Sequence, residues 1–242
     1  MKRIPVALLT VLLTGFVLAQ SKEFWQTRDY RQWTEKECRK LLDNSPWAQD
    51  HTINSTYIEP LQTQSSDRAR ERNTQMTYHV QFRSALPVRQ ALVRLQQLSS
   101  KYDQMPPEQK QEFDQRAARL LEANFADIVA VHVSYSSNVA IYDREMANYW
   151  QVQTTEKLRN STFLIGPKGQ KIPPQRVTVT TGAGREFTLY FPRLVEGQPL
   201  VTPQDKSIKL EFNHPRVSDQ NESRVLLEFK IEKMLMQGAV VY

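Results

Sequence analysis

The sequence predicts an α+β protein in which an N-terminal capped helix and an αα-hairpin pack on a sheet, followed by a β-sandwich-like C-terminal half. Two observations lead to this prediction. Helical periodicity disappears from Ser161 onward, and six of the seven glycines lie at or after Gly166. Alternating segments separated by glycine and proline turns are typical of β-sandwiches. We therefore expect an α+β region over residues 20–160 and a β-rich, sandwich-like region over residues 161–242.

Residues 1–19 have the pattern of a secretory signal peptide. Lys2 and Arg3 supply a positive start, an apolar run follows, and Val17-Leu18-Ala19 fits the cleavage site. The apolar run is short for a transmembrane helix, and charged residues follow it closely. The sequence thus predicts an exported protein, periplasmic or secreted, which meets the membrane only if the signal segment stays uncleaved.

Charge and cysteine content limit the classes of function. The chain of 242 residues has a formal net charge of +6, and loss of Lys2 and Arg3 leaves 30 basic against 26 acidic side chains. A mild charge without a basic run does not predict nucleic-acid binding. Cys38 is the one cysteine, so no internal disulfide can form, and the core has to stabilise the fold. This cysteine content fits bacterial export better than eukaryotic secretion.

The densest local signal is the segment Asp29–Trp47, which predicts one short helix with a defined start. Thr34 and Glu37 have the spacing of a capping box, and Trp33 and Cys38 have the spacing of a hydrophobic staple. The structural motif that we expect from this segment consists of Trp33, Thr34, Glu37, Cys38, Leu41, Leu42, Pro46 and Trp47.

The end of this helix is also marked. Cys38, Leu41 and Leu42 share one apolar face, Asn44 suits a left-handed C-terminal conformation, and Pro46 prevents continuation. Only two or three turns fit between these signals, and a helix of that length is not stable alone in water. We therefore expect it to dock on a core, with the Cys38 thiol buried and unreactive.

Large rings surround the predicted helix, and two interpretations of them are open. The aromatic residues of this region are Trp25, Tyr30, Trp33 and Trp47. Either they pin the helix onto the core, as the usual burial of large rings favours, or they form an aromatic binding patch.

The remaining elements of residues 20–160 follow from periodicity. Alternation predicts strands at Ile53–Ile58, at 76–82 and at Ile128–Tyr135, the last with Val129, Val131, Val133 and Tyr135 on its core face. Residues 62–73 are polar and predict an exposed loop or a helix cap region. Helical spacing predicts an αα-hairpin, with one helix from Pro87 to about Tyr102 and a second that starts at Pro106 and has Phe113, Ala117, Leu120, Leu121 and Phe125 on its apolar face.

A third helix is predicted with Asn138 as its cap, and its Asp143 and Glu145 are expected on a solvated face. In the C-terminal region, strands are predicted at Thr162–Ile165, Arg176–Thr181, Glu186–Phe191, Ser207–Phe212, Arg224–Ile231 and Ala239–Tyr242. Arg193, after Phe191-Pro192, is predicted to bind a carboxylate of this chain or of a partner at a sheet end.

Motifs for enzyme chemistry are missing from the sequence. It contains no H-E-x-x-H, C-x-x-C, G-x-S-x-G or Walker pattern, and no two of its four histidines have metal-ligand spacing. We therefore predict no catalytic, metal or cofactor site from motifs. One constellation remains, because His79 and His132 lie opposite the apolar faces of predicted strands and could share a surface with Ser134. A hydrolase would further need an orienting acid within hydrogen-bond reach.

The segment Trp33-Thr34-x-x-Glu37-Cys38-x-x-Leu41-Leu42-x-x-Ser45-Pro46-Trp47 resembles the W-[ST]-x-x-E-C-x-x-L-L-x-x-S-P-W segment of a family of uncharacterised exported proteins of acidobacterial type. Phe191-Pro192-Arg193 and the ending from Met234 to Gly238 resemble theirs too. The chain is also faintly similar to exported proteins named for a G-W-x-T-D motif, although it does not contain that motif. Neither resemblance implies an activity or a functional residue.

These observations favour an exported protein of the bacterial envelope that binds a protein or surface component without catalysis. Two alternatives stay open. One is an exported hydrolase whose site forms in the fold near His79, His132 and Ser134, and the other is a carrier of a small apolar ligand with aromatic residues lining its cavity. A deep polar pocket would favour the hydrolase, an apolar cavity the carrier, and a flat apolar patch the binding module.

Overall fold

The computed structural model describes residues 23–58, 71–180, 184–215 and 223–242, and within them the predicted α+β fold with a sandwich of sheets is confirmed. The predicted signal peptide and most of the predicted loop at 62–73 lie outside the described residues. None of the helices in the described ranges is long and apolar enough to span a membrane.

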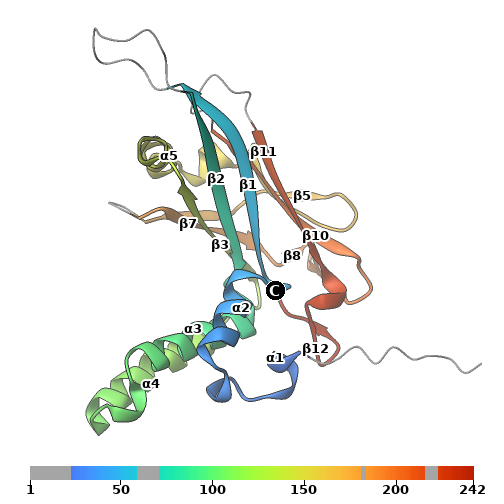
Figure 1. Ribbon diagram of the computed structural model, residues 1–242. Helices are drawn as coiled ribbons and strands as arrows, with labels where there is room; N and C mark the ends of the chain where they lie inside the picture. Colours follow the sequence, from blue (N-terminus) through green and yellow to red (C-terminus); the bar gives the residue numbers. More distant parts are fainter. Residues whose placement is uncertain (1–22, 59–70, 181–183, 216–222) are drawn as a thin grey trace, which may run out of the picture.

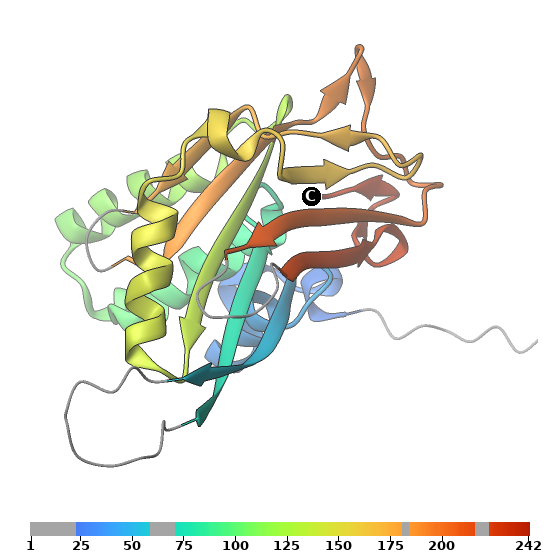
Figure 2. The same cartoon turned by 90° about the horizontal axis from the view of Figure 1, so that it is seen from above.

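Two antiparallel sheets form the sandwich (Figure 1). Sheet A, within the described residues, has the strand order β1 (Ala48–Ile58), β2 (Glu71–Phe82), β3 (Ile128–Ser137), β7 (Glu186–Pro192) and β6 (Arg176–Val179). Sheet B, within the same residues, has the order β11 (Ser223–Lys230), β10 (Ser207–His214), β4 (Thr162–Ile165) and β5 (Lys171–Ile172). Sheet A therefore takes strands from both predicted regions. Seen from above, β11 lies beside β1 (Figure 2).

Two short pairs of strands complete the β-structure, β8 (Leu194–Val195) with β9 (Gln198–Pro199) and β12 (Leu235–Met236) with β13 (Ala239–Val240). All six strands predicted for the C-terminal region exist within the described residues. Strand β4 has the predicted bounds, the other strands differ at one or both ends, and the last is reduced to the two residues of β13. The four strands that the sequence did not predict, β5, β8, β9 and β12, have two residues each, too few for alternation to show.

The core lies between the sheets because apolar side chains alternate along the strands. The predicted core face of β3 is confirmed, since Val129, Val131, Val133 and Tyr135 are all buried. Rings join the layers: Phe82 of β2 meets Phe229 of β11 at 4.8 Å between centroids, and Tyr78 meets Phe212 at 5.1 Å. Such edge-to-face pairs bury large apolar areas in a defined geometry.

The helices pack at the margins of the sandwich (Figure 1). Their bounds are α1 (Phe24–Thr27), α2 (Glu35–Asp43), α3 (Leu86–Ser99), α4 (Pro107–Leu121), α5 (Ala140–Gln151) and α6 (Thr155–Leu158). Short 3-10 turns cover Tyr30–Gln32, Tyr102–Gln104 and Ile231–Lys233. The predicted αα-hairpin is α3 with α4, and Arg89 of α3 donates to the last carbonyls of α4, those of Leu120 and Leu121.

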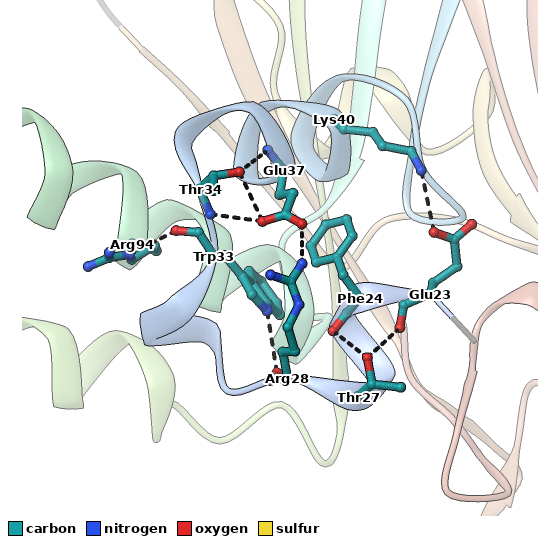
Figure 3. A network of polar contacts seen from close by, with 9 residues as sticks. All are labelled: Glu23, Phe24, Thr27, Arg28, Trp33, Thr34, Glu37, Lys40 and Arg94. Atoms are coloured by element: carbon teal, nitrogen blue, oxygen red, sulfur yellow. Dashed lines mark hydrogen bonds and ion pairs between the residues drawn. The ribbon is translucent and has the colours of Figure 1, made fainter. Parts of the chain in front are cut away.

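Helix α2 has the predicted start. The Thr34 hydroxyl accepts from the Glu37 amide, and the Glu37 carboxylate accepts from the Thr34 amide, so the capping box is formed (Figure 3). Arg28 pairs with the same carboxylate, and hydrogen bonding by Thr34 lowers the pKa of Glu37. The buried face is also as expected, because Trp33 and Cys38 are almost fully inaccessible. Burial raises the pKa of the Cys38 thiol to about 11, which keeps it protonated.

The rings of the N-terminal segment pack together and against the end of the chain. Trp25 meets Trp47 at 5.8 Å between centroids, and the Trp47 indole donates to the carbonyl of Val241. The carbonyl of Trp33 accepts from Arg94 of α3 at 3.0 Å (Figure 3). The tryptophans thus link α1, α2, α3 and the C-terminal residues, and their burial agrees with the docking interpretation.

The predicted roles of Asn44 and Asn138 at helix ends are wrong. Asn44 is extended, with φ −149° and ψ 91°, because the chain enters an isolated bridge between Ser45 and Ala48. Asn138 accepts from the Gln75 amide and so ties β2 to the β3–α5 junction, while Val139 occupies the N-cap position.

Asp143 is buried and not solvated. It accepts from the Ser137 amide at 2.7 Å and pairs with Arg185 at 2.6 Å. These two partners compensate for the loss of water around the buried carboxylate. On α4 only Phe113 of the predicted apolar face is fully buried, and Leu120 stays 39% exposed. Helix α4 packs on α3 and on the 3-10 turn Tyr102–Gln104, and most of its residues are exposed or half-buried.

We expect the neighbouring residues Trp33 and Thr34 to contribute different amounts to the free energy of unfolding. Thr34→Ala removes one capping bond and should lower the free energy of unfolding by about 1 kcal/mol. Trp33→Ala leaves a large cavity and should lower it by about 3 kcal/mol or more. Thermal unfolding beside the parent measures both, because each 1 kcal/mol shifts the midpoint by about 2–4 °C. A Trp33→Ala protein that melts within about a degree of the parent would defeat the docking interpretation.

Candidate functional site on the outer face of sheet A

Polar side chains from four strands meet on the face of sheet A that points away from sheet B. The register pairs Asp50 of β1 with His79 of β2, His79 with Ser134 of β3, and Ser134 with Glu186 of β7. The next row pairs Gln81 of β2 with His132 of β3. The structure therefore places His79, His132 and Ser134 on one surface, as predicted for neighbouring strands.

His79 is hydrogen-bonded through both ring nitrogens. Its Nδ1 lies 2.5 Å from the Asp50 carboxylate, and its Nε2 lies 2.9 Å from the main-chain carbonyl of Leu42 in the last turn of α2. The last four carbonyls of a helix have no intrahelical partner. The outer face of sheet A therefore supplies side-chain partners to the C-terminal end of α2.

Gln81 takes part in the same contact. Its Nε2 donates to the Leu42 carbonyl at 2.7 Å and lies 2.9 Å from His79 Nε2, while its Oε1 accepts from Arg83 Nε at 2.7 Å. Gln81 is only 5% exposed, so these bonds form away from water. The guanidinium fixes which end of the amide faces the imidazole, because an arginine can only donate.

His132 is held on the neighbouring strands. Its Nδ1 lies 3.2 Å from the Thr188 hydroxyl, and its Nε2 lies 3.4 Å from the Glu186 carboxylate. Burial, followed by the nearby positive charge of Arg83, lowers the pKa of His132 to about 4, and Glu186 opposes this shift. His132 is therefore neutral at pH 7.

A depression of about 300 Å³ lies between this row and the end of α2. It is lined by Asp43, Asp50, Thr77, His79, Ser134, Tyr135 and Ser136. Two carboxylates from different elements and hydroxyl groups from two strands therefore border one open space. Such a surface can hydrogen-bond a polar group.

The three residue types of a serine hydrolase are present here, but their bonds differ from those of a catalytic triad. In a triad the second ring nitrogen takes the proton of the nucleophile, and the first is oriented by a carboxylate. Asp50 supplies the orienting carboxylate, yet His79 Nε2 faces the Leu42 carbonyl and the Gln81 amide instead of Ser134. As arranged, the imidazole holds a helix end.

Sequence reasoning missed Asp50 and Gln81. Asp50 precedes the strand that was predicted to begin at Ile53, whereas β1 begins at Ala48. Extending the predicted strand toward the N-terminus would have placed Asp50 on the same outward face as Thr52, two residues later. Gln81 alternates correctly with Val80 and Phe82, but nothing in its neighbours reveals that a helix carbonyl lies above it.

A second polar cluster is enclosed in the sandwich. His214 of β10 lies 2.8 Å from the Tyr78 hydroxyl through Nδ1 and 2.8 Å from the Tyr142 hydroxyl through Nε2. Burial, with a smaller effect of His51, lowers the pKa of His214 to about 4. A neutral histidine between two hydroxyls can donate on one side and accept on the other, which satisfies both nitrogens inside the core.

The other residues singled out in the sequence have structural contacts. Arg193 donates to the main-chain oxygens of Phe125 and Tyr242, and its guanidinium lies 4.2 Å from the Tyr242 ring centroid. It binds groups of its own chain. Within the described ranges, no three His, Cys, Asp or Glu side chains are grouped so as to hold a metal ion.

Comparisons with models of protein families, with curated proteins and with solved structures give no match.

The two histidines with lowered pKa values, His132 and His214, predict a defined pH dependence of stability. Each has a folded-state pKa near 4, below its ordinary value of 6.5, so the unfolded state binds more protons between these values. Stability is fully present above about pH 6.5 and is lost as the pH falls toward 4. Between pH 7 and pH 5 each histidine should remove about 2 kcal/mol.

Urea unfolding of the parent and of His214→Gln at both pH values measures this effect. We expect the variant, whose amide can still donate and accept between the two tyrosines, to lose about 2 kcal/mol less than the parent over that interval. His132→Gln should behave in the same way. An unchanged pH dependence in both variants would show that these histidines are protonated alike in the folded and unfolded states.

Proposed function

We propose that the protein is an exported binding module of the bacterial envelope, periplasmic or secreted, that binds a protein or surface component without catalysis. The observation that carries the proposal is the polar depression on the outer face of sheet A, bordered by Asp43 and Asp50. It is open to solvent at the end of α2 and lies on a sheet that the sandwich core makes rigid, a combination that suits recognition.

The bonding of the imidazoles supports a binding role over a catalytic one. His79 contacts Asp50 and the Leu42 carbonyl, and His132 contacts Thr188 and Glu186. A general base needs a ring nitrogen within reach of the proton that it removes. Both rings instead use their nitrogens to connect elements of the fold.

Filled packing between the sheets gives the apolar-carrier alternative little support. Trp150 of α5 stacks on Phe187 of β7 at 4.1 Å between centroids, and Trp150 also meets Phe212 at 5.9 Å. In the described part of the core these rings occupy the space that a carried ligand would need.

Site-directed photo-crosslinking tests the binding proposal in the living cell. A photoreactive phenylalanine analogue replaces Ser136, an exposed residue of the depression, and in a matched variant it replaces Gln111, an exposed residue of α4. We expect a discrete crosslinked product in the envelope fraction from position 136 and none of the same mass from position 111. No product from position 136, or the same product from both positions, would contradict the proposal.

An exported hydrolase is the second candidate, and the 2.5 Å contact between Asp50 and His79 favours it. The serine that the register places opposite His79 would be the nucleophile, and His79 Nε2 would have to leave the Leu42 carbonyl to reach it. The hydrolase requires this rearrangement and the binding module does not.

A fluorophosphonate probe distinguishes them, because it labels serines activated by a neighbouring base. We expect the purified mature protein to stay unlabelled at Ser134 and Ser134→Ala to behave as the parent does. Labelling that disappears in both Ser134→Ala and His79→Gln would establish the hydrolase instead.

A further inference from the structure

The hydrogen atoms around His79 Nε2 cannot satisfy all of its neighbours at once. The Leu42 carbonyl, 2.9 Å away, can only accept, so that contact needs a proton on Nε2. The Gln81 amide nitrogen, also 2.9 Å away, can only donate, so that contact needs Nε2 to be bare. The two contacts therefore belong to different protonation states of the imidazole.

The amide of Gln81 cannot resolve this conflict by turning over. Its Oε1 accepts from Arg83 Nε at 2.7 Å, and a flip would bring the amide NH₂ against the guanidinium. Arg83 thus keeps the Gln81 NH₂ directed at His79 and Leu42. Its two hydrogens match two acceptors, the Leu42 carbonyl and a bare Nε2.

The Asp50 carboxylate determines the protonation of the other ring nitrogen, Nδ1. It accepts from Nδ1, so Nδ1 carries a proton in both states. In the neutral state Nε2 accepts from Gln81, and the Leu42 carbonyl is held by Gln81 alone. In the charged state Nε2–H donates to the Leu42 carbonyl and repels the facing hydrogen of Gln81.

We propose that His79 is a proton-operated latch on helix α2. When His79 takes up a proton, the donor to the Leu42 carbonyl changes from the Gln81 amide to His79 Nε2–H. When His79 loses the proton, the donor changes back to Gln81. The carbonyl belongs to the residue before Asp43, which lines the depression. The same proton therefore changes both the hold on the depression wall and the charge between its two carboxylates.

Charged and titratable groups from every neighbouring element face the latch. They are Asp43 of α2, Asp50 of β1, Arg83 of β2, His132 of β3 and Glu186 of β7. Of these, the Asp50 carboxylate is in direct contact with the imidazole.

Nitrogen NMR of the histidine-labelled protein tests the latch, and it does not depend on any ligand or on the proposed function. At the alkaline end we expect His79 with Nδ1 protonated and Nε2 bare. On acidification Nε2 should gain the proton, and the side-chain NH₂ signals of Gln81 should shift with the same midpoint.

Two carboxylate variants serve as test and control. Asp50→Asn removes the charge in contact with Nδ1, so the exchange should occur at a lower pH than in the parent. Asp43→Asn removes a charge from the same depression without a hydrogen bond to His79, and it should shift the exchange less.

A bare Nδ1 with a protonated Nε2 in the neutral ring would overturn the proposal. So would Gln81 signals that stay constant while His79 titrates, because the two residues would then not share the carbonyl.

Discussion

The last turn of helix α2 leaves the Leu42 carbonyl without an intrahelical partner, and two side chains of β2 supply one. This contact ties the C-terminal end of α2 to sheet A. A nine-residue helix is too short to be stable alone, so its position depends on what holds its ends and its buried face. The Thr34–Glu37 capping box holds the start, and the outer face of the sheet holds the end.

The polar row across sheet A follows from this requirement. A histidine and a glutamine can reach a main-chain carbonyl only from the face that the core does not use, and they need neighbours to orient them. Asp50 orients His79, and Arg83 orients Gln81. The result superficially has the composition of a catalytic centre, while its hydrogen bonds run to the backbone. Composition and register alone do not separate these roles, but the direction of each ring nitrogen does.

Local signals predicted the parts of the fold that local physics determines. The capping box, the burial of Trp33 and Cys38 and the alternating core face of β3 were all predicted from spacing. The depression was not predictable in the same way, because Asp43 and Asp50 meet only through the docking of α2 and the register of β1 on β2. The role of a main-chain acceptor such as the Leu42 carbonyl cannot be predicted from the sequence, because every residue has the same carbonyl group.

Native-state hydrogen exchange of the α2 amides tests the central claim that β2 holds the end of this helix. The comparison is between the parent, Gln81→Ala, and Thr52→Ala, a control that removes a hydroxyl bonded to Thr77 on the same strand pair. Loss of one buried hydrogen bond of about 1.4 kcal/mol should speed local exchange about tenfold. The account predicts this acceleration at Cys38–Asn44 in Gln81→Ala, with the β3 amides unchanged and Thr52→Ala like the parent. Unchanged protection of α2 in Gln81→Ala would contradict it.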